Sequence, residues 1–232
     1  MLLERIKKGV HKKLRKGQAG FRPKRSTTEQ IFILRNILEQ ANEWRAGLYV
    51  RFEHPFTSMI AGMTGSGKTA WVRSLLQQAS ETIYLPPERI VWCYSQWQPA
   101  YTELLVFMAH IGFVKGILTA LEQDSYFAVN KRNLIVFCDQ MIDASKDKRI
   151  VNLFTRGSHR NRSVICIVQN LFHQGKGSRS ISLNSHYLVL LKNPQDKLQI
   201  LTLAKQMYPG QTDFFINQCE KAVKRPFWLS AD

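Results

Sequence analysis

The part of the chain after about residue 51 alternates short apolar runs with segments of helical periodicity. Buried strands are predicted where apolar residues follow one another, at residues 56–61, 89–94, 133–138, 163–168 and 186–191. Helices are predicted where apolar residues recur at helical spacing, over residues 70–79, 103–113, 148–154, 196–207 and 212–222. Strands separated by helices indicate a mainly parallel sheet with helices on both faces, so we expect a three-layer α/β domain.

The beginning of the chain has a different pattern. Apolar residues recur at helical spacing over residues 1–14, with Lys and Arg between them, which predicts a basic helix. Glycines and a proline then interrupt the pattern before Ser26, which forms with Glu29 a capping box for a second helix. We therefore expect a basic helical segment over residues 1–51 and a larger α/β domain over residues 52–232.

The net charge of the chain indicates which class of partner it binds. The 232 residues include 33 Lys and Arg against 17 Asp and Glu, a net charge of +16, and 13 of the basic residues lie in the first 51. This excess suits polyanions such as nucleic acid. No apolar run is long enough to span a membrane, and the amino end lacks the apolar region of a secretory leader. We expect an intracellular protein, nuclear or cytoplasmic, without a membrane partner.

The four cysteines are far apart in the sequence and form no CxxC pair, so no structural zinc site is expected. Cys93, Cys138 and Cys166 fall in apolar runs, and we interpret them as small buried side chains.

Residues 62–69 match the phosphate-binding pattern G-x-x-x-x-G-K-[ST] in full, between a predicted strand and a predicted helix. Glycine lets the backbone wrap an anion with its N–H groups turned inward, and the helix adds the positive end of its dipole. ATP is expected to bind at Gly62, Thr64, Gly65, Ser66, Gly67, Lys68 and Thr69. Lys68 would contact the β- and γ-phosphates, and the Thr69 hydroxyl would bind Mg²⁺.

An ATP-bound Mg²⁺ also needs an acidic residue at the end of a neighbouring strand, and Asp139 follows the apolar run 133–138. Two registers are open. If Asp139 binds the metal, Gln140 occupies the position of the water-activating acid. If Asp139 activates the water, Cys138 stands where the metal-binding acid would be. One carboxylate is missing in either register, and a third interpretation makes Asp139 only a turn cap.

The strand at 89–94 comes between the phosphate loop and this acid in the sequence. That order is typical of RecA-like NTPases of the additional-strand type and favours a motor over a small-molecule kinase. In such a protein the end of the strand at 163–168 would lie beside the γ-phosphate. Gln169, with Asn170 as the alternative, would sense that phosphate, unless it is merely an amide that ends the strand.

Three arginines, Arg156, Arg160 and Arg162, lie around the start of that strand. One of them would complete the nucleotide site of a neighbouring subunit, or they would contact DNA phosphates, or they form a solvated basic turn. Residues 175–179 are interpreted as a flexible basic loop that would follow a DNA backbone in the pore of a ring.

Several segments carry a family resemblance, namely residues 59–72, 89–101, 133–141, 153–197 and 203–210. In them the chain resembles the DNA-packaging ATPases of Maverick/Polinton-type transposons and adintoviruses, members of the FtsK–HerA superfamily together with poxvirus-type packaging ATPases. The resemblance implies an ATP-driven homo-oligomeric ring that moves double-stranded DNA, with a capsid or portal component as partner. Family members tend to have two acids where this chain has Cys138 and Asp139. The resemblance therefore favours the register in which Cys138 replaces the metal-binding acid.

Residues 17–49 resemble part of the fingers region of LINE-type retrotransposon reverse transcriptases. The strand with a catalytic aspartate that would follow is replaced by residues 51–55, Arg-Phe-Glu-His-Pro, and no Tyr-x-Asp-Asp-type motif occurs later. We therefore expect a mobile-element fusion, in which a fragment without polymerase activity precedes the packaging-ATPase-like domain.

Three functions are compatible with these features. The first is a DNA-translocating P-loop ATPase, with catalytic residues Lys68, Asp139, Gln169, Arg156 and Arg160. The second is a hydrolysis-impaired, nucleic-acid-binding relic of a gene fusion, which the missing carboxylate favours. The third, a small-molecule kinase, would require a lid and an acceptor pocket, and the sequence shows no clear sign of either.

Overall fold

The computed structural model describes residues 51–117, 127, 130–138, 148–156, 161–172, 176–191, 197–207, 210 and 212–224. The chain divides into two units, Met1–Val50 and Arg51–Asp232, and all described residues belong to the second. The helices predicted within the first 50 residues therefore lie outside the described residues. Asp139, Gln140 and Arg160 lie outside them as well.

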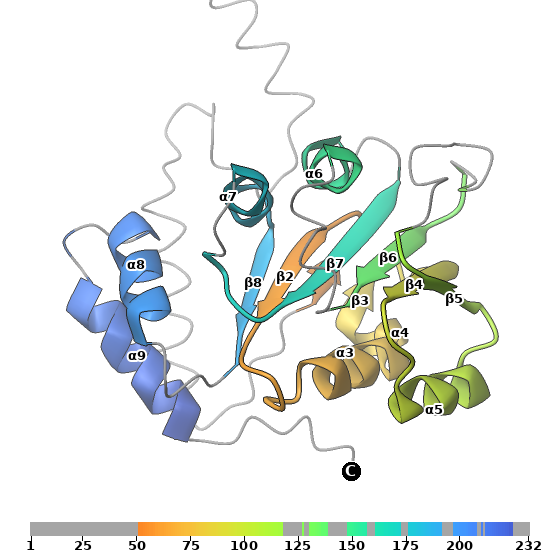
Figure 1. Ribbon diagram of the computed structural model, residues 1–232, viewed down its shortest axis with the longest axis horizontal. Helices are drawn as coiled ribbons and strands as arrows, with labels where there is room; N and C mark the ends of the chain where they lie inside the picture. Colours follow the sequence, from red (N-terminus) through yellow and green to blue (C-terminus); the bar gives the residue numbers. More distant parts are fainter. Residues whose placement is uncertain are drawn as a thin grey trace, which may run out of the picture. The chain divides into compact units, whose positions relative to one another are not determined.

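A six-stranded sheet forms the centre of the second unit (Figure 1). Its strands are, in spatial order, β5 (Ile111–Lys115), β4 (Arg89–Tyr94), β6 (Asn133–Phe137), β7 (Arg162–Val168), β2 (Thr57–Ala61) and β8 (Tyr187–Leu190). Every neighbouring pair is parallel. A separate two-stranded parallel sheet joins β1 (Phe52–Glu53) to β3 (Ile83–Tyr84).

Helices cover both faces of the large sheet (Figure 1). One face carries α3 (Lys68–Gln77), α4 (Ala79–Thr82) and α5 (Pro99–Phe107). The other carries α6 (Lys148–Arg156), α7 (Lys176–Leu183), α8 (Lys197–Met207) and α9 (Thr212–Lys224). The predicted three-layer α/β class is confirmed. None of the described helices is long and apolar enough to cross a membrane.

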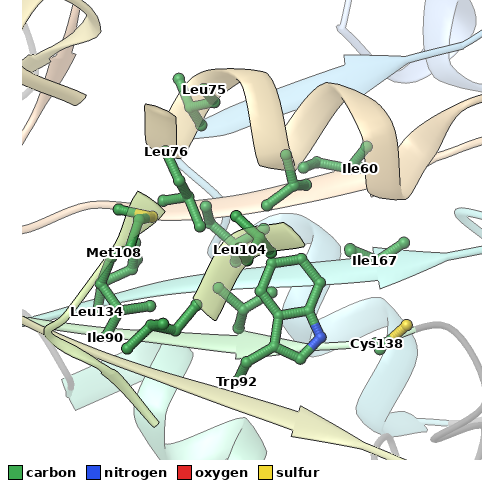
Figure 2. Close-up of a cluster of buried hydrophobic side chains, with 14 of the residues drawn as sticks. Ile60, Leu75, Leu76, Ile90, Trp92, Leu104, Met108, Leu134, Cys138 and Ile167 are labelled. Atoms are coloured by element: carbon green, nitrogen blue, oxygen red, sulfur yellow. The ribbon is translucent and has the colours of Figure 1, made fainter. Parts of the chain in front are cut away.

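Alternate residues of the strands enter two hydrophobic clusters, one on each face of the sheet. The cluster on the α3 and α5 face includes Ile60, Leu75, Trp92, Leu104 and Ile167 (Figure 2). The cluster on the opposite face includes Met59, Ile135, Leu153, Cys166 and Ile181. All residues of β2 and β6 are buried, because both of their faces are covered, and their sequences therefore show no polar–apolar alternation. The cysteines predicted to be buried, Cys93, Cys138 and Cys166, are buried.

The order of the strands is that of a RecA-like NTPase with an additional strand, as predicted. β7 lies between β2, which precedes the phosphate loop, and β6, which precedes the acid. The strand that separates them in the sheet is therefore β7. The strand at 89–94 was the basis on which this arrangement was predicted. That strand is β4, which lies on the other side of β6 and does not separate β2 from β6.

Two predicted elements are wrong. Residues 103–113 are not one helix, because α5 ends at Phe107 and Ile111–Lys115 forms β5 at the edge of the sheet. The backbone of Met108 is extended (φ −132°, ψ 93°), and pairing with β4 outweighs the helical spacing of the apolar residues. Residues 175–179 are not simply a loop, since α7 begins at Lys176. Its Ile181 is buried in the second cluster and packs the helix against the sheet.

Side-chain hydrogen bonds tie the amino end of β2 to both of its neighbours. On the β7 side, the Ser163 hydroxyl accepts a hydrogen bond from the Phe56 N–H (3.0 Å) and lies 2.6 Å from His54 Nδ1. On the β8 side, the Thr57 N–H donates to His186 Nδ1 (3.0 Å). These contacts fix the register of β2 at one end, and the phosphate loop leaves from the other end.

We expect His54→Ala to lower the free energy of unfolding by roughly 1–3 kcal/mol, because it leaves the buried Ser163 hydroxyl without its imidazole partner. Urea unfolding followed by circular dichroism would measure the change. His110→Ala is the matched control, since His110 is exposed. Equal unfolding midpoints for the two variants would contradict the role given to His54.

Candidate nucleotide-binding site

The phosphate loop connects the carboxyl end of β2 to the amino end of α3, which is where its sequence pattern requires it to lie. The Gly62 N–H donates to the carbonyl of Val168 at the end of β7 (3.2 Å), which anchors the start of the loop to the neighbouring strand. Within the loop, the Ser66 N–H donates to the Met63 carbonyl (3.1 Å). Gly65 and Gly67 have φ values of 78° and 90°, a region that residues with a Cβ atom enter at a cost.

Gly62 is required for a different reason. A Cβ atom at this position would lie 2.6 Å from Ser66 Oγ and 2.9 Å from Leu191 Cβ, both far inside van der Waals contact. The first glycine of the loop therefore provides space for close packing, whereas Gly65 and Gly67 provide backbone freedom.

Lys68 lies across the start of the loop. Its ammonium group donates to the carbonyls of Gly62 (2.7 Å) and Met63 (3.0 Å), and the residue is buried. The loop carbonyls thus hold the ammonium group within the loop, where a bound phosphate would compete with them for it. Thr69, the second residue of α3, is half-buried, and Thr64 is exposed.

The start of α3 suits an anion. The helix has no side-chain cap, and no acidic residue occurs in its first turn to neutralise the dipole. Ser66 Oγ is a buried atom without a hydrogen-bond partner. An unsatisfied hydroxyl, two glycines with positive φ and a lysine beside uncapped N–H groups form a donor set that fits the phosphates of a nucleotide. The Thr69 hydroxyl is the described group that would hold the accompanying Mg²⁺.

The end of β6 places Cys138 on the face of the sheet that carries α3. Leu134, Val136 and Cys138 alternate into the cluster on that face, while Ile135 and Phe137 enter the other cluster. The Cys138 thiol is buried and accepts a hydrogen bond from the Tyr101 hydroxyl (3.1 Å). The alternation puts the side chain at position 138 on the phosphate-loop face. The role of Asp139, the next residue, stays a prediction.

The end of β7 brings Gln169 next to the phosphate loop. Val168 is paired with Ala61 and accepts the hydrogen bond from Gly62, so Gln169 follows directly beside the loop. Gln169 is exposed, whereas Asn170 Oδ1 accepts a hydrogen bond from the Phe172 N–H (2.8 Å). Of the two predicted candidates, Asn170 is engaged in a local turn, which leaves Gln169 the better placed to contact a ligand.

The arginines are not equivalent. Arg162 is only 1% exposed and its guanidinium lies 4.8 Å from the centre of the Phe127 ring. It begins β7 and is buried, so it offers no exposed guanidinium to a neighbouring subunit, and its inclusion among the candidates is corrected. Arg156 is the last residue of α6, and its side chain, like Arg160, lies outside what the structure describes.

Sequence reasoning missed Tyr101, which reaches the end of β6 from the first turns of α5. Tyr101 and Cys138 are 37 residues apart, and neither belongs to a motif that links them. The one available signal was the density of aromatic residues over residues 92–101, which form a continuous set of ring contacts around Tyr101.

The family model described as "Poxvirus A32 protein" matches residues 49–208, more than half of the chain, including the phosphate loop and all six strands of the sheet. The chain belongs to this family. No protein with a curated description matches it significantly. The family match contains almost none of residues 17–49, so the resemblance of that segment to a reverse transcriptase is unsupported and stays a prediction.

Solved structures resemble the chain at low sequence identity. The genome packaging NTPase B204 from Sulfolobus turreted icosahedral virus 2, in complex with ATP-gammaS, has a TM-score of 0.48 at 8% identity and covers 69% of this chain and 86% of its own. The flagellar accessory protein FlaH from Methanocaldococcus jannaschii has a TM-score of 0.42 at 12% identity, over 60% and 72% of the two chains. The Type VII secretion ATPase EccC from Thermomonospora curvata has a TM-score of 0.43 at 14% identity, over 60% and 20%.

We expect Gly62→Ala to weaken ATP binding at least about tenfold, because the added methyl group displaces Ser66 and Leu191 from the loop. Fluorescence anisotropy with a labelled ATP analogue would measure the affinity. Gly112→Ala is the matched control, since a Cβ atom there comes no closer than 4.0 Å to its nearest neighbour, the Ile90 carbonyl oxygen. Unchanged affinity in Gly62→Ala would show that the loop does not bind in this conformation.

Proposed function

We propose that the chain is a P-loop ATPase that binds ATP with Mg²⁺ and uses its hydrolysis to move double-stranded DNA. The observation that carries the proposal is the complete phosphate loop at the carboxyl edge of a sheet in which β7 separates the loop strand from the acid strand. Membership of the Poxvirus A32 protein family and the resemblance of residues 59–210 to packaging ATPases support the DNA-packaging part of the proposal.

In this proposal each residue of the site has a defined task. The loop N–H groups and Lys68 bind the β- and γ-phosphates, which requires the ammonium to leave the carbonyls of Gly62 and Met63. The Thr69 hydroxyl binds the metal. When bound there, Mg²⁺ would neutralise part of the negative charge of the phosphates. Gln169 contacts the γ-phosphate from the end of β7, and Asp139 serves the metal or the attacking water.

The assembly is proposed to be a homo-oligomeric ring. Arg156 and Arg160 precede β7, so each would act on the nucleotide of a neighbouring subunit rather than on its own. The net charge of +16 supports DNA as the track, because phosphate contacts dominate the affinity of proteins for DNA. A capsid or portal component is the proposed docking partner.

One observation favours a second candidate function. Cys138 is on the phosphate-loop face of the sheet, in the position that the preferred register assigns to a metal-binding acid. A protonated thiol is a poor ligand for Mg²⁺, which prefers oxygen. The alternative is therefore a hydrolysis-impaired relic that retains nucleic-acid binding. Turnover separates the two candidates.

We expect the purified chain to hydrolyse ATP in the presence of Mg²⁺, faster with double-stranded DNA, and Lys68→Ala to lower the turnover by roughly 100-fold or more. A phosphate-release assay would measure it. Lys205→Ala is the matched control, because Lys205 is an exposed lysine of α8.

Three outcomes decide between the candidates. DNA-stimulated turnover that depends on Lys68 supports the motor. Turnover that appears only in Cys138→Asp supports the relic and the register with Cys138 in place of an acid. If neither the original chain nor Cys138→Asp hydrolyses ATP, and neither binds it, the proposal is contradicted.

A further inference from the structure

Three aromatic and sulfur side chains meet at the carboxyl end of β6. Tyr101 is fully buried, and its hydroxyl donates to the thiol of Cys138, which is 4% exposed. Trp92 on β4 is paired with Val136, which precedes Cys138 by two residues on the same face of the sheet. The Tyr101 and Trp92 rings are in contact, with centroids 5.4 Å apart. The three side chains therefore form one group on the face of the sheet that carries α3 and α5.

The position of the Tyr101 ring is strongly determined. It stacks on Phe113 with centroids 5.3 Å apart, and Tyr94 and Trp97 contact it at 5.8 Å and 5.6 Å. A ring held by so many neighbours loses little entropy when its hydroxyl forms a hydrogen bond. Tyr101 is thus a rigid donor aimed at position 138.

Trp92 presents a second donor. Its Nε1–H is buried and has no hydrogen-bond partner, which is unusual for an indole at 0% exposure. Figure 2 shows the indole nitrogen on the side of the ring that is turned toward the end of the strand where Cys138 lies. The Trp92 N–H is therefore a second buried donor near this end of the sheet, where the Cys138 thiol accepts from Tyr101 and is only a weak acceptor.

The backbone of Cys138 is held as well, since its N–H donates to the carbonyl of Cys93 on β4 (3.0 Å). Asp139 follows immediately in the sequence. A contact that fixes the side chain and the backbone of residue 138 therefore fixes the last described residue before Asp139.

α5 also contacts α3, the helix that begins in the phosphate loop, through an ion pair between Arg73 and Glu103. α5 thus connects the end of the acid strand, through Tyr101, with the phosphate-binding helix, through Glu103.

We propose that Tyr101 is a positioning residue of the nucleotide site, that it acts through Cys138, and that Trp92 supplies a second donor to the same position. The inference rests on the proposed ATPase function. Tyr101 touches neither nucleotide nor metal. It holds Cys138 at the end of β6, one residue before Asp139, and the two donors together suit an acceptor with two oxygen atoms at position 138.

Tyr101→Phe tests the first part, because it keeps the ring and its stacking contacts and removes only the hydroxyl. We expect the kcat for ATP hydrolysis to fall at least about tenfold, with the KM for ATP within about twofold of its original value. Tyr94→Phe is the matched control, since it removes a hydroxyl from a half-buried ring of the same cluster. Equal kcat values for the two variants would overturn the role of Tyr101.

Action through Cys138 is tested by a double-mutant cycle. In a Cys138→Ala background, which has no acceptor at this position, Tyr101→Phe should change kcat by less than about twofold. A full tenfold loss in that background would show that Tyr101 acts by another route.

A readout independent of catalysis separates failure of this inference from failure of the proposed function. Hydrogen exchange of the Cys138 amide, which bonds to the Cys93 carbonyl, should become at least about tenfold faster in Tyr101→Phe and not in Tyr94→Phe. If the original chain neither binds nor hydrolyses ATP, the proposed function fails, and amide exchange alone decides whether Tyr101 holds the end of the strand. Unchanged exchange would overturn the inference in either case.

Cys138→Asp tests the second donor. A carboxylate offers acceptors for both the Tyr101 hydroxyl and the Trp92 N–H. We expect the indole N–H resonance of Trp92, assigned with Trp92→Phe, to move downfield in Cys138→Asp. A resonance that does not move would overturn the assignment of Trp92 to this position.

Discussion

The parallel pairing of β2 with β7 is the constraint on which the candidate site depends. Five consecutive residue pairs, from Thr57 with Val164 to Ala61 with Val168, place the ends of the two strands side by side. The same pairing brings the first glycine of the phosphate loop to the carbonyl of Val168 and sets Gln169 next to the loop. A shift of one residue would exchange the two faces of β2 and turn Met59 and Ala61 into the wrong cluster. The buried polar contacts at the amino end of β2 oppose such a shift, so residues far from the phosphate loop help to determine its place.

The fold was predictable because its central strands, β4, β6, β7 and β2, are buried on both faces. The predicted strand at 89–94 coincides with β4, and the one at 133–138 exceeds β6 by one residue. The phosphate-loop pattern marks the turn from β2 into α3. The prediction failed where a local pattern competed with a contact distant in sequence. Residues 111–115 have helix-like spacing but pair with β4, and an edge strand of mixed burial has no distinctive pattern of its own.

The candidate site was predictable only where one continuous segment builds it. Lys68, Thr69 and the glycines lie within eight residues, and a single pattern describes them. The surroundings of Cys138 come instead from β4, α5 and β6, and their meeting depends on the packing of aromatic rings that the sequence does not encode as a motif. The same limit applied to Arg162, where the sequence could not distinguish an exposed basic turn from a guanidinium buried against Phe127.

All six strands of the large sheet run parallel, and this has a consequence for how the chain is made. β2 is the first strand of that sheet to leave the ribosome, yet both of its partners, β7 and β8, come more than 100 residues later. Parallel pairing also requires a crossover for every neighbouring pair, and contacts of such long range form slowly. β4, β5 and β6 can pair with one another first, whereas β2 and the loop that follows it can take their place only after β7 and β8 have been synthesised. The phosphate loop is therefore synthesised before most of the sheet and is among the last parts of the sheet to acquire its shape. A chain truncated before β7 would hold the complete motif without a site.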